Sequence, residues 1–171
     1  MKFKFFTLFL TALVPMSFIG VTNADSLKPH SKDATIVSKE LLLKNAAKFH
    51  VNYSAGRFDE NGPLVAENIQ INALNNELNG RESFVKFIKE AASPFPGQQL
   101  HDRVIILDGN IAAVNFAFQG KNTAPFGSTP PTKRNVDVFA GEIFEFNSQG
   151  LMQKLITILE FDRVEAQLQG K

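Results

Sequence analysis

The spacing of hydrophobic residues changes once along this chain, after Gly97, and this change limits the folds that the chain can adopt. Before Gly97, apolar residues recur at helical spacing, in a helix predicted to end near Ala55 and in another over Arg81 to Ala92. After Gly97, apolar and polar residues alternate, and turn residues such as Asp108-Gly109-Asn110 separate the segments. Helices followed by an antiparallel meander predict an α+β fold, with the helices packed on one face of a curved sheet.

The alternating segments define the predicted sheet. Strands are expected at residues 68–73, 101–107, 111–119, 135–146 and 155–163. A short helix is expected at 57–67, and a crossing rich in Pro and Gly at 122–132. The domain is predicted to span residues 35–165, with a tail at 166–171.

The first 24 residues have the layout of a secretory signal peptide. Lys2 and Lys4 precede an uncharged, apolar run, and small residues end at Ala24. The alternative is a transmembrane anchor, but the run is short for a span of about 20 residues and Pro15 interrupts it. Cleavage after Ala24 would leave 147 of the 171 residues, with a flexible lead-in at 25–34. This predicts a periplasmic or extracellular protein that does not stay inserted in a membrane.

Composition excludes several kinds of site. The chain has no cysteine, so it has no disulfide, thiolate ligand or thiol nucleophile. Its net charge is +1 and its basic residues are scattered, which argues against a nucleic-acid interface. Three widely separated histidines give no metal-ligand spacing, and we expect neither a metal nor a cofactor. The chain has 17 Phe, one Tyr and no Trp. This indicates a large apolar interior with few of the hydroxyl and indole N–H groups that Tyr and Trp would supply.

Four motifs in order carry a resemblance to a known family. They are FHVNYSAGRF at 49–58, Gly80-Arg81-Glu82, Pro94-Phe95-Pro96, and FGSTPPTKRNV at 126–136. Together they resemble the SnoaL-like group of the nuclear transport factor 2-like superfamily, over about residues 36–163. The resemblance implies a cone-shaped sheet wrapped round a helix, an internal cavity and, often, a homodimer.

The resemblance also implies where catalytic residues would lie. SnoaL-like polyketide cyclases use a carboxylate on the final strand, in a motif that commonly ends His-Trp-Asp. In the same register this chain has Leu155, Ile156 and Thr157. The usual catalytic acid is therefore expected to be absent from this strand. Ketosteroid isomerases, on the same fold, use a first-helix Tyr and an Asp base, and the corresponding positions here are Phe49 and either Asn72 or Ala73.

Three other residues are candidates for acid–base chemistry. His101 is the best lone imidazole for this work, although a surface histidine at a strand end is the more common case. Asp137 and Glu142 are the carboxylates to consider first for a pocket, and strand alternation places them on opposite faces. His50 is interpreted as a packed, satisfied histidine, and Tyr53 as a core aromatic with its hydroxyl at the rim.

Three functions are consistent with these observations. The first is the binding of a small apolar or amphipathic molecule in a cavity, without strong catalysis. The second is a cyclase or isomerase that uses a relocated residue, His101, Glu142 or Asp137. The third is a homodimeric interaction module. The cavity lining is predicted to comprise Phe49, Tyr53, Phe84, Phe87, Phe116, Phe118, Leu155, Thr157 and Leu159.

Overall fold

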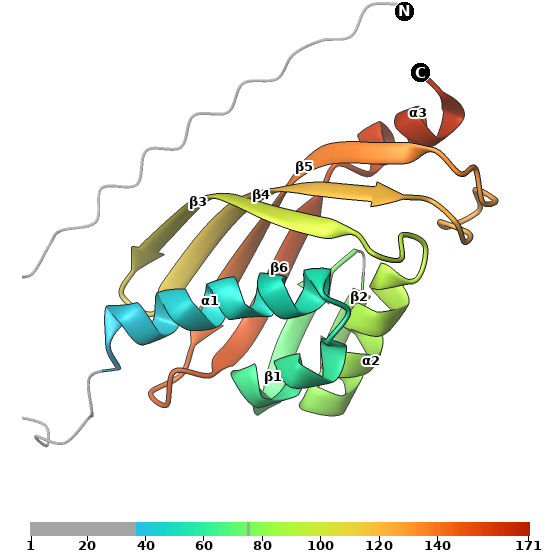
Figure 1. Cartoon of the computed structure of the whole chain (residues 1–171). Coiled ribbons are helices and arrows are strands. Elements are labelled where there is room, and N and C mark those ends of the chain that lie inside the picture. Colours follow the sequence, from blue (N-terminus) through green and yellow to red (C-terminus); the bar gives the residue numbers. More distant parts are fainter. Residues whose placement is uncertain (1–36, 75) are drawn as a thin grey trace, which may run out of the picture. The chain divides into compact units, whose positions relative to one another are not determined.

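The structure is a computed structural model that describes residues 37–74 and 76–171 (Figure 1). The predicted signal peptide at 1–24 and the lead-in at 25–34 lie outside these residues. In chain order the elements are α1 (Lys39–Ser54), a 3-10 helix η1 (Phe58–Leu64), β1 (Val65–Ala73), β2 (Asn76–Asn79), α2 (Arg81–Ala92), β3 (Gln99–Asp108), β4 (Ile111–Lys121), β5 (Asn135–Phe146), β6 (Met152–Leu159) and α3 (Phe161–Gln169).

The six strands form one sheet in the order β2-β1-β6-β5-β4-β3. All neighbours pair antiparallel except β1 and β6, which pair parallel. Figure 1 shows α1 and α2 on the same side of this curved sheet. The mixed α+β architecture expected from the sequence is therefore confirmed.

The sequence of α1 explains which face it buries. Ser38 caps the helix by accepting a hydrogen bond from the Leu41 amide at 3.2 Å. The buried residues then recur at helical spacing and face the sheet and α2: Leu42, Ala46, Phe49, His50 and Tyr53. Because Phe49, His50 and Tyr53 share this face, α1 carries aromatic and polar groups into the interior of the domain.

A buried asparagine holds the crossing between β4 and β5. The Asn122 side chain donates to the carbonyl of Ala124 at 2.7 Å and accepts from the Thr132 amide at 2.7 Å. Its amide nitrogen also lies 3.4 Å from the carbonyl of Pro94. The crossing is thereby fixed to the end of α2, and it places Phe126 against Phe95, with ring centroids 5.6 Å apart.

The end of the chain differs from the prediction. The last strand ends at Leu159 rather than Arg163, and α3 replaces the predicted tail. Val164 and Leu168, four residues apart, bury the inner face of α3. The Phe161 ring stacks on Phe126 with centroids 5.9 Å apart. The strand prediction was wrong here because Ile158 and Leu159 continue an apolar run that hides the change to helical spacing.

Within the described residues, none of the helices combines the length and the apolar character that crossing a bilayer would require.

Candidate active site

A narrow apolar cavity of about 70 Å³ lies between α1, α2 and the inner face of the sheet. Most of the side chains around it are apolar, and several are aromatic. Those from the helices are Phe49, Tyr53, Phe87, Ile88, Ala91 and Val164, and those from β3 to β6 are Leu100, Phe116, Phe118, Ala140, Glu142, Leu155, Thr157 and Leu159. Leu74, Phe95 and Phe126 complete the wall. Among these lining residues, Glu142 is the one charged side chain.

Three polar groups line this cavity. Glu142 of β5 pairs directly with Thr157 of β6, so both side chains emerge on the inner face. The Thr157 hydroxyl donates a hydrogen bond to Glu142 Oε1 at 3.1 Å. Tyr53 lies on the opposite wall, on α1. Burial, and next the charge of Glu142, raise the pKa of the Tyr53 phenol, which therefore remains a protonated donor at neutral pH.

Behind Glu142, a buried histidine joins two carboxylates. His50 Nε2 lies 2.7 Å from Glu142 Oε2, and His50 Nδ1 bonds to Asp102 Oδ1 of β3. His50 is 2 % exposed and Glu142 is 6 % exposed, whereas the Asp102 side chain is 25 % exposed. The imidazole also packs edge-on against the Phe116 ring, with centroids 4.6 Å apart. The result is a cluster of three ionisable side chains, which we call the Asp102–His50–Glu142 triad.

The two carboxylates determine the charge of His50. Burial alone lowers the pKa of an imidazole, but the charge of Glu142 and the hydrogen bonds to Asp102 and Glu142 outweigh it. They raise the pKa of His50 from 6.5 to about 9. At neutral pH His50 is thus an imidazolium that donates from both ring nitrogens.

A β-bulge in β3 aligns Asp102 with His50. The register of β3 against β4 shifts between Asp102 and Val104, so that Arg103 is an additional residue on the edge strand. Strict alternation along β3 would place His101, Arg103 and Ile105 on one face. The bulge overturns this, because Ile105 packs against the core while His101 is exposed.

The predicted site residues separate into three groups. Eight of the nine predicted lining residues surround the cavity, and the exception is Phe84, which is fully buried in the core and does not line it. Glu142 faces the cavity. His101 and Asp137 are both exposed, and Asp137 accepts a hydrogen bond from Gln119 at 3.0 Å. Neither of these two can act in the cavity as the structure stands.

Sequence reasoning missed Asp102 and undervalued His50. His50 is indeed satisfied by hydrogen bonds, as interpreted, but its partners are two carboxylates and one of them lines the cavity. The available signal was the position of His50 on the apolar stripe of α1. Asp102 gave no signal of its own. The bulge at Arg103 changes which residues of β3 face inward, so strict alternation does not predict that Asp102 meets His50.

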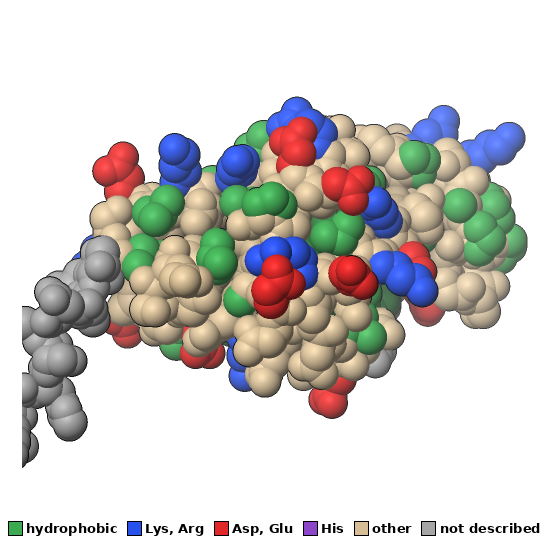
Figure 2. Space-filling view, turned by 90° about the horizontal axis from the view of Figure 1, so that it is seen from below, with side chains coloured by type: hydrophobic (Ala, Val, Ile, Leu, Met, Phe, Trp, Pro, Cys, Tyr) green, Lys and Arg blue, Asp and Glu red, His purple; other side chains and the backbone are tan. Residues whose placement is uncertain are grey.

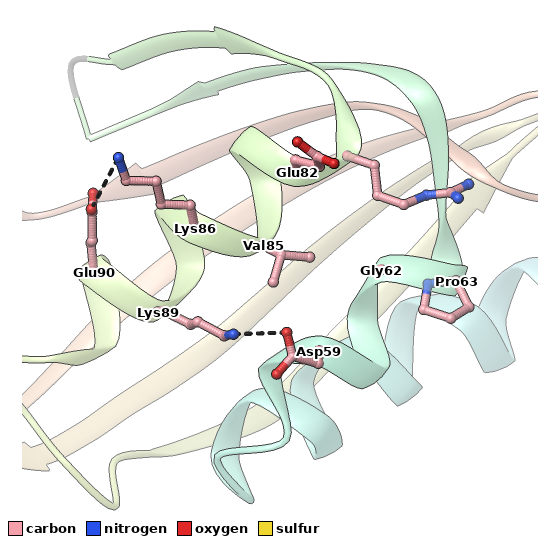
Figure 3. A pocket seen from close by; sticks show the side chains of 9 residues that line it. Asp59, Gly62, Pro63, Glu82, Val85, Lys86, Lys89 and Glu90 are labelled. Atoms are coloured by element: carbon pink, nitrogen blue, oxygen red, sulfur yellow. Dashed lines mark hydrogen bonds and ion pairs between the residues drawn. The ribbon is translucent and has the colours of Figure 1, made fainter.

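A larger hollow, of about 740 Å³, lies between η1 and α2 (Figure 3). It is an open groove with paired charges, where Lys89 contacts Asp59 at 2.7 Å and Lys86 approaches Glu90 at 3.9 Å. Figure 2 likewise shows acidic and basic side chains interspersed on the face seen there. We place the site in the smaller cavity, because there a buried ionisable group, Glu142, meets an apolar space.

Within residues 37–74 and 76–171, no three His, Asp or Glu side chains are grouped so that they could hold a metal ion.

Comparisons with known proteins agree with this architecture. The family model for SnoaL-like polyketide cyclases matches residues 44–153, which is well over half of the chain. A search of curated proteins gives no match.

Solved structures share the fold at low sequence identity. A protein from Jannaschia sp. CCS1, described as a SnoaL-like polyketide cyclase, is 16 % identical, with a TM-score of 0.72 over 82 % of this chain and 99 % of that one. A protein from Xanthomonas campestris, described as a polyketide cyclase, is 14 % identical, with a TM-score of 0.70 over 76 % and 98 %. A de novo designed protein with a curved β-sheet is 13 % identical, with a TM-score of 0.61 over 78 % and 96 %. Since a designed protein matches as well, these likenesses concern the fold alone.

Proposed function

The chain belongs to the SnoaL-like polyketide cyclase family, and from this premise we propose that it is an acid–base enzyme of the cyclase or isomerase type in which Glu142 acts on a small apolar carbonyl compound. Family membership supports a domain with a cavity for a small molecule. The identity of the acid–base group and the class of substrate are argued from the cavity itself.

The observation that carries the proposal is the position of Glu142 beside Thr157. The family resemblance places a catalytic aspartate at the position of Thr157. Here the carboxylate comes from the neighbouring strand, directly across the β5–β6 pair and 3.1 Å from the Thr157 hydroxyl. A carboxylate therefore reaches the same part of the cavity from the next strand.

The proposed reaction is a proton transfer next to a carbonyl group. Glu142 Oε1 takes a proton from the carbon beside the carbonyl, and the electron pair of the broken C–H bond forms an enolate. The Tyr53 hydroxyl donates a hydrogen bond to the enolate oxygen, where the negative charge develops. In an isomerisation, the Glu142 carboxylic acid then returns the proton to the far carbon of a conjugated enolate. In a cyclisation, the enolate carbon attacks a second carbonyl group of the same molecule, and the Glu142 carboxylic acid gives its proton to the alkoxide oxygen that forms.

The size of the cavity limits the substrate. A volume of about 70 Å³ is well below the roughly 300–1,000 Å³ of common ligand pockets. A ring-sized compound therefore enters only if part of the wall moves. Phe87 and Phe126 are the half-buried aromatic residues on α2 and on the crossing, and we expect these two side chains to move.

We expect the chain to exchange the protons beside the carbonyl of small cyclic ketones, such as cyclohexanone, 2-cyclohexenone and 1-indanone, with solvent deuterium. The loss of these proton signals in D₂O is followed by NMR, with buffer alone as the reference. Exchange no faster than in buffer for every ketone would contradict the proposal. If the same ketones raised the melting temperature without exchange, the chain would be a binding protein rather than an enzyme.

A second candidate function is self-association through the outer face of the sheet. Large apolar side chains are exposed on four neighbouring strands of this face: Val104, Ile106, Ile111, Phe139 and Ile158. A sheet face of this kind can pair with the same face of a second copy about a two-fold axis.

We therefore expect a dimer in light scattering at micromolar concentration. Replacing Ile106 and Ile158, which are 62 % and 59 % exposed, by glutamate should give a monomer, because charges would then be buried in the interface. Val51→Glu is the matched control, since Val51 is equally exposed, at 58 %, but lies on α1. A monomeric wild-type chain would rule out this candidate.

The properties of residues 1–24 support export. Two lysines followed by an uncharged apolar run are typical of a signal peptide, and the small residues before Asp25 suit cleavage by a signal peptidase. Expression of the full chain in a bacterium should yield a protein that begins at Asp25 in the periplasm, as read by N-terminal sequencing. A protein that keeps its first 24 residues would contradict export.

A further inference from the structure

Asp102 belongs to the triad but not to the cavity. It lies on β3, an edge strand of the sheet, and it is the most exposed of the three side chains. Among the described residues, its side chain has one hydrogen-bond partner, His50, which bonds to Asp102 with one ring nitrogen and to Glu142 with the other. The hydrogen-bonded connection between Asp102 and the cavity therefore runs through the imidazole.

We propose that Asp102 is a positioning residue, which holds His50 as an imidazolium whose Nε2–H fixes one oxygen of Glu142 and leaves the other oxygen for the substrate. The part that concerns the substrate rests on the function proposed above. The part that concerns the charge and orientation of His50 does not.

The hydrogen-bond partners support this role. A neutral imidazole has one N–H donor and one acceptor nitrogen, whereas an imidazolium has two donors. Both partners of His50 are carboxylate oxygens, Asp102 Oδ1 and Glu142 Oε2, so both ring nitrogens must donate if both carboxylates are ionised. Aromatic rings pack around the imidazole, with Phe116 at 4.6 Å, Phe49 at 5.4 Å and Phe144 at 6.2 Å between centroids.

The two oxygens of Glu142 are thereby made different. Oε2 is occupied by His50, at 2.7 Å. Oε1 accepts only from the Thr157 hydroxyl among the described residues, and a hydroxyl leaves further acceptor capacity on that oxygen. Proton transfer is therefore directed to Oε1, the oxygen that also accepts the hydrogen bond from Thr157.

Two carboxylates contact His50. Asp102 faces it from β3 and Glu142 from β5, and both carboxylates raise its pKa. On α1, the helix that also carries His50, burial and then the charge of Glu142 raise the pKa of Tyr53. From β4 the ring meets the uncharged Phe116. Replacement of Asp102 thus removes one of two charges that keep the imidazole protonated.

The test is the titration of the His50 ring, followed by NMR of ¹⁵N-labelled histidine in the full chain, with the His50 signals identified by their loss in His50→Gln. In the wild type we expect both ring nitrogens to be protonated at pH 7.5. In Asp102→Asn, which keeps the shape of the side chain and removes its charge, the titration midpoint should fall by about 1–3 pH units. Asp108→Asn, at the exposed end of the same strand, should leave the midpoint unchanged.

Each result decides the proposal. A wild-type His50 with a single protonated nitrogen at pH 7.5 would overturn it without any variant. An unchanged midpoint in Asp102→Asn would also overturn it.

The exchange of ketone protons supplies the second readout. Asp102→Asn should shift the pH profile of exchange to lower pH together with the His50 titration, and an unchanged profile would remove Asp102 from the reaction. If the wild type shows no exchange but the midpoint still falls, the proposed function fails while the effect of Asp102 on the charge of His50 stands.

Discussion

Glu142→Gln should lower the rate of ketone proton exchange by about 10²–10⁴-fold, which is the usual contribution of a general acid–base group. Glutamine has nearly the shape of glutamate, but its amide cannot accept the substrate proton. Because Glu142 is the only charged side chain among those that line the cavity, no neighbour on the wall can replace it. The measurement is NMR of the same ketones in D₂O at equal protein concentration.

The controls are the other two residues that the sequence offered for this role. Asp137→Asn and His101→Gln alter exposed positions outside the cavity and should leave the exchange rate unchanged. A loss of exchange in either control, with activity retained in Glu142→Gln, would assign the reaction to a different residue. Binding of a ketone to Glu142→Gln, seen as a raised melting temperature, would show that the cavity is intact.

His50→Leu should lower the free energy of unfolding at pH 7 by about 3–5 kcal/mol, the typical cost of removing one partner from a buried ion pair. Leucine has a similar volume, so the main loss is the imidazolium between Asp102 and Glu142. Glu142, which is nearly fully buried, would keep only the Thr157 hydroxyl as a donor among the described residues. Urea denaturation measures the effect.

Two variants separate charge from packing. His101→Leu makes the same substitution at an exposed histidine and should change stability by no more than about 0.5 kcal/mol. His50→Leu combined with Glu142→Leu should be more stable than His50→Leu alone, because it also removes the carboxylate left without its partner. If His50→Leu were as stable as the wild type, the triad would not contribute to folding.

The stability of the wild type should also depend on pH through His50. The pKa of His50 is raised in the folded chain to about 9, so the stabilisation is complete below pH 6.5 and is lost as the pH rises through about 9. A shift of this size corresponds to roughly 3 kcal/mol. His50→Leu should lack this loss, and His101→Leu should retain it.

The fold could be predicted from the sequence because its signals are local. Apolar residues four or three apart define α2, and strict alternation defines β5 at the bounds that the structure shows. The C-terminal helix was missed because its pattern is only nine residues long and directly follows an apolar strand.

The candidate site could be predicted only in part. Glu142 was one of three alternatives, and alternation alone separates it from Asp137 without showing which of the two faces inward. The triad depends on contacts between residues 52 and 92 positions apart in the sequence, and on a bulge at Arg103. Neither has a local pattern, so a single sequence does not reveal them.

The position of β6 in the sheet has a consequence for how the chain reaches this structure. β6 is the last strand in the sequence, yet it lies between β1 and β5, and β1 has no other partner towards β3 to β5. The β1–β2 hairpin and the β3–β5 meander can each form early, since their pairings are local, but they stay separate until residues 152–159 join them. A chain whose residues 152–159 have not yet left the ribosome therefore cannot complete this sheet. The cavity closes only once residues 152–159 can pair with both β1 and β5.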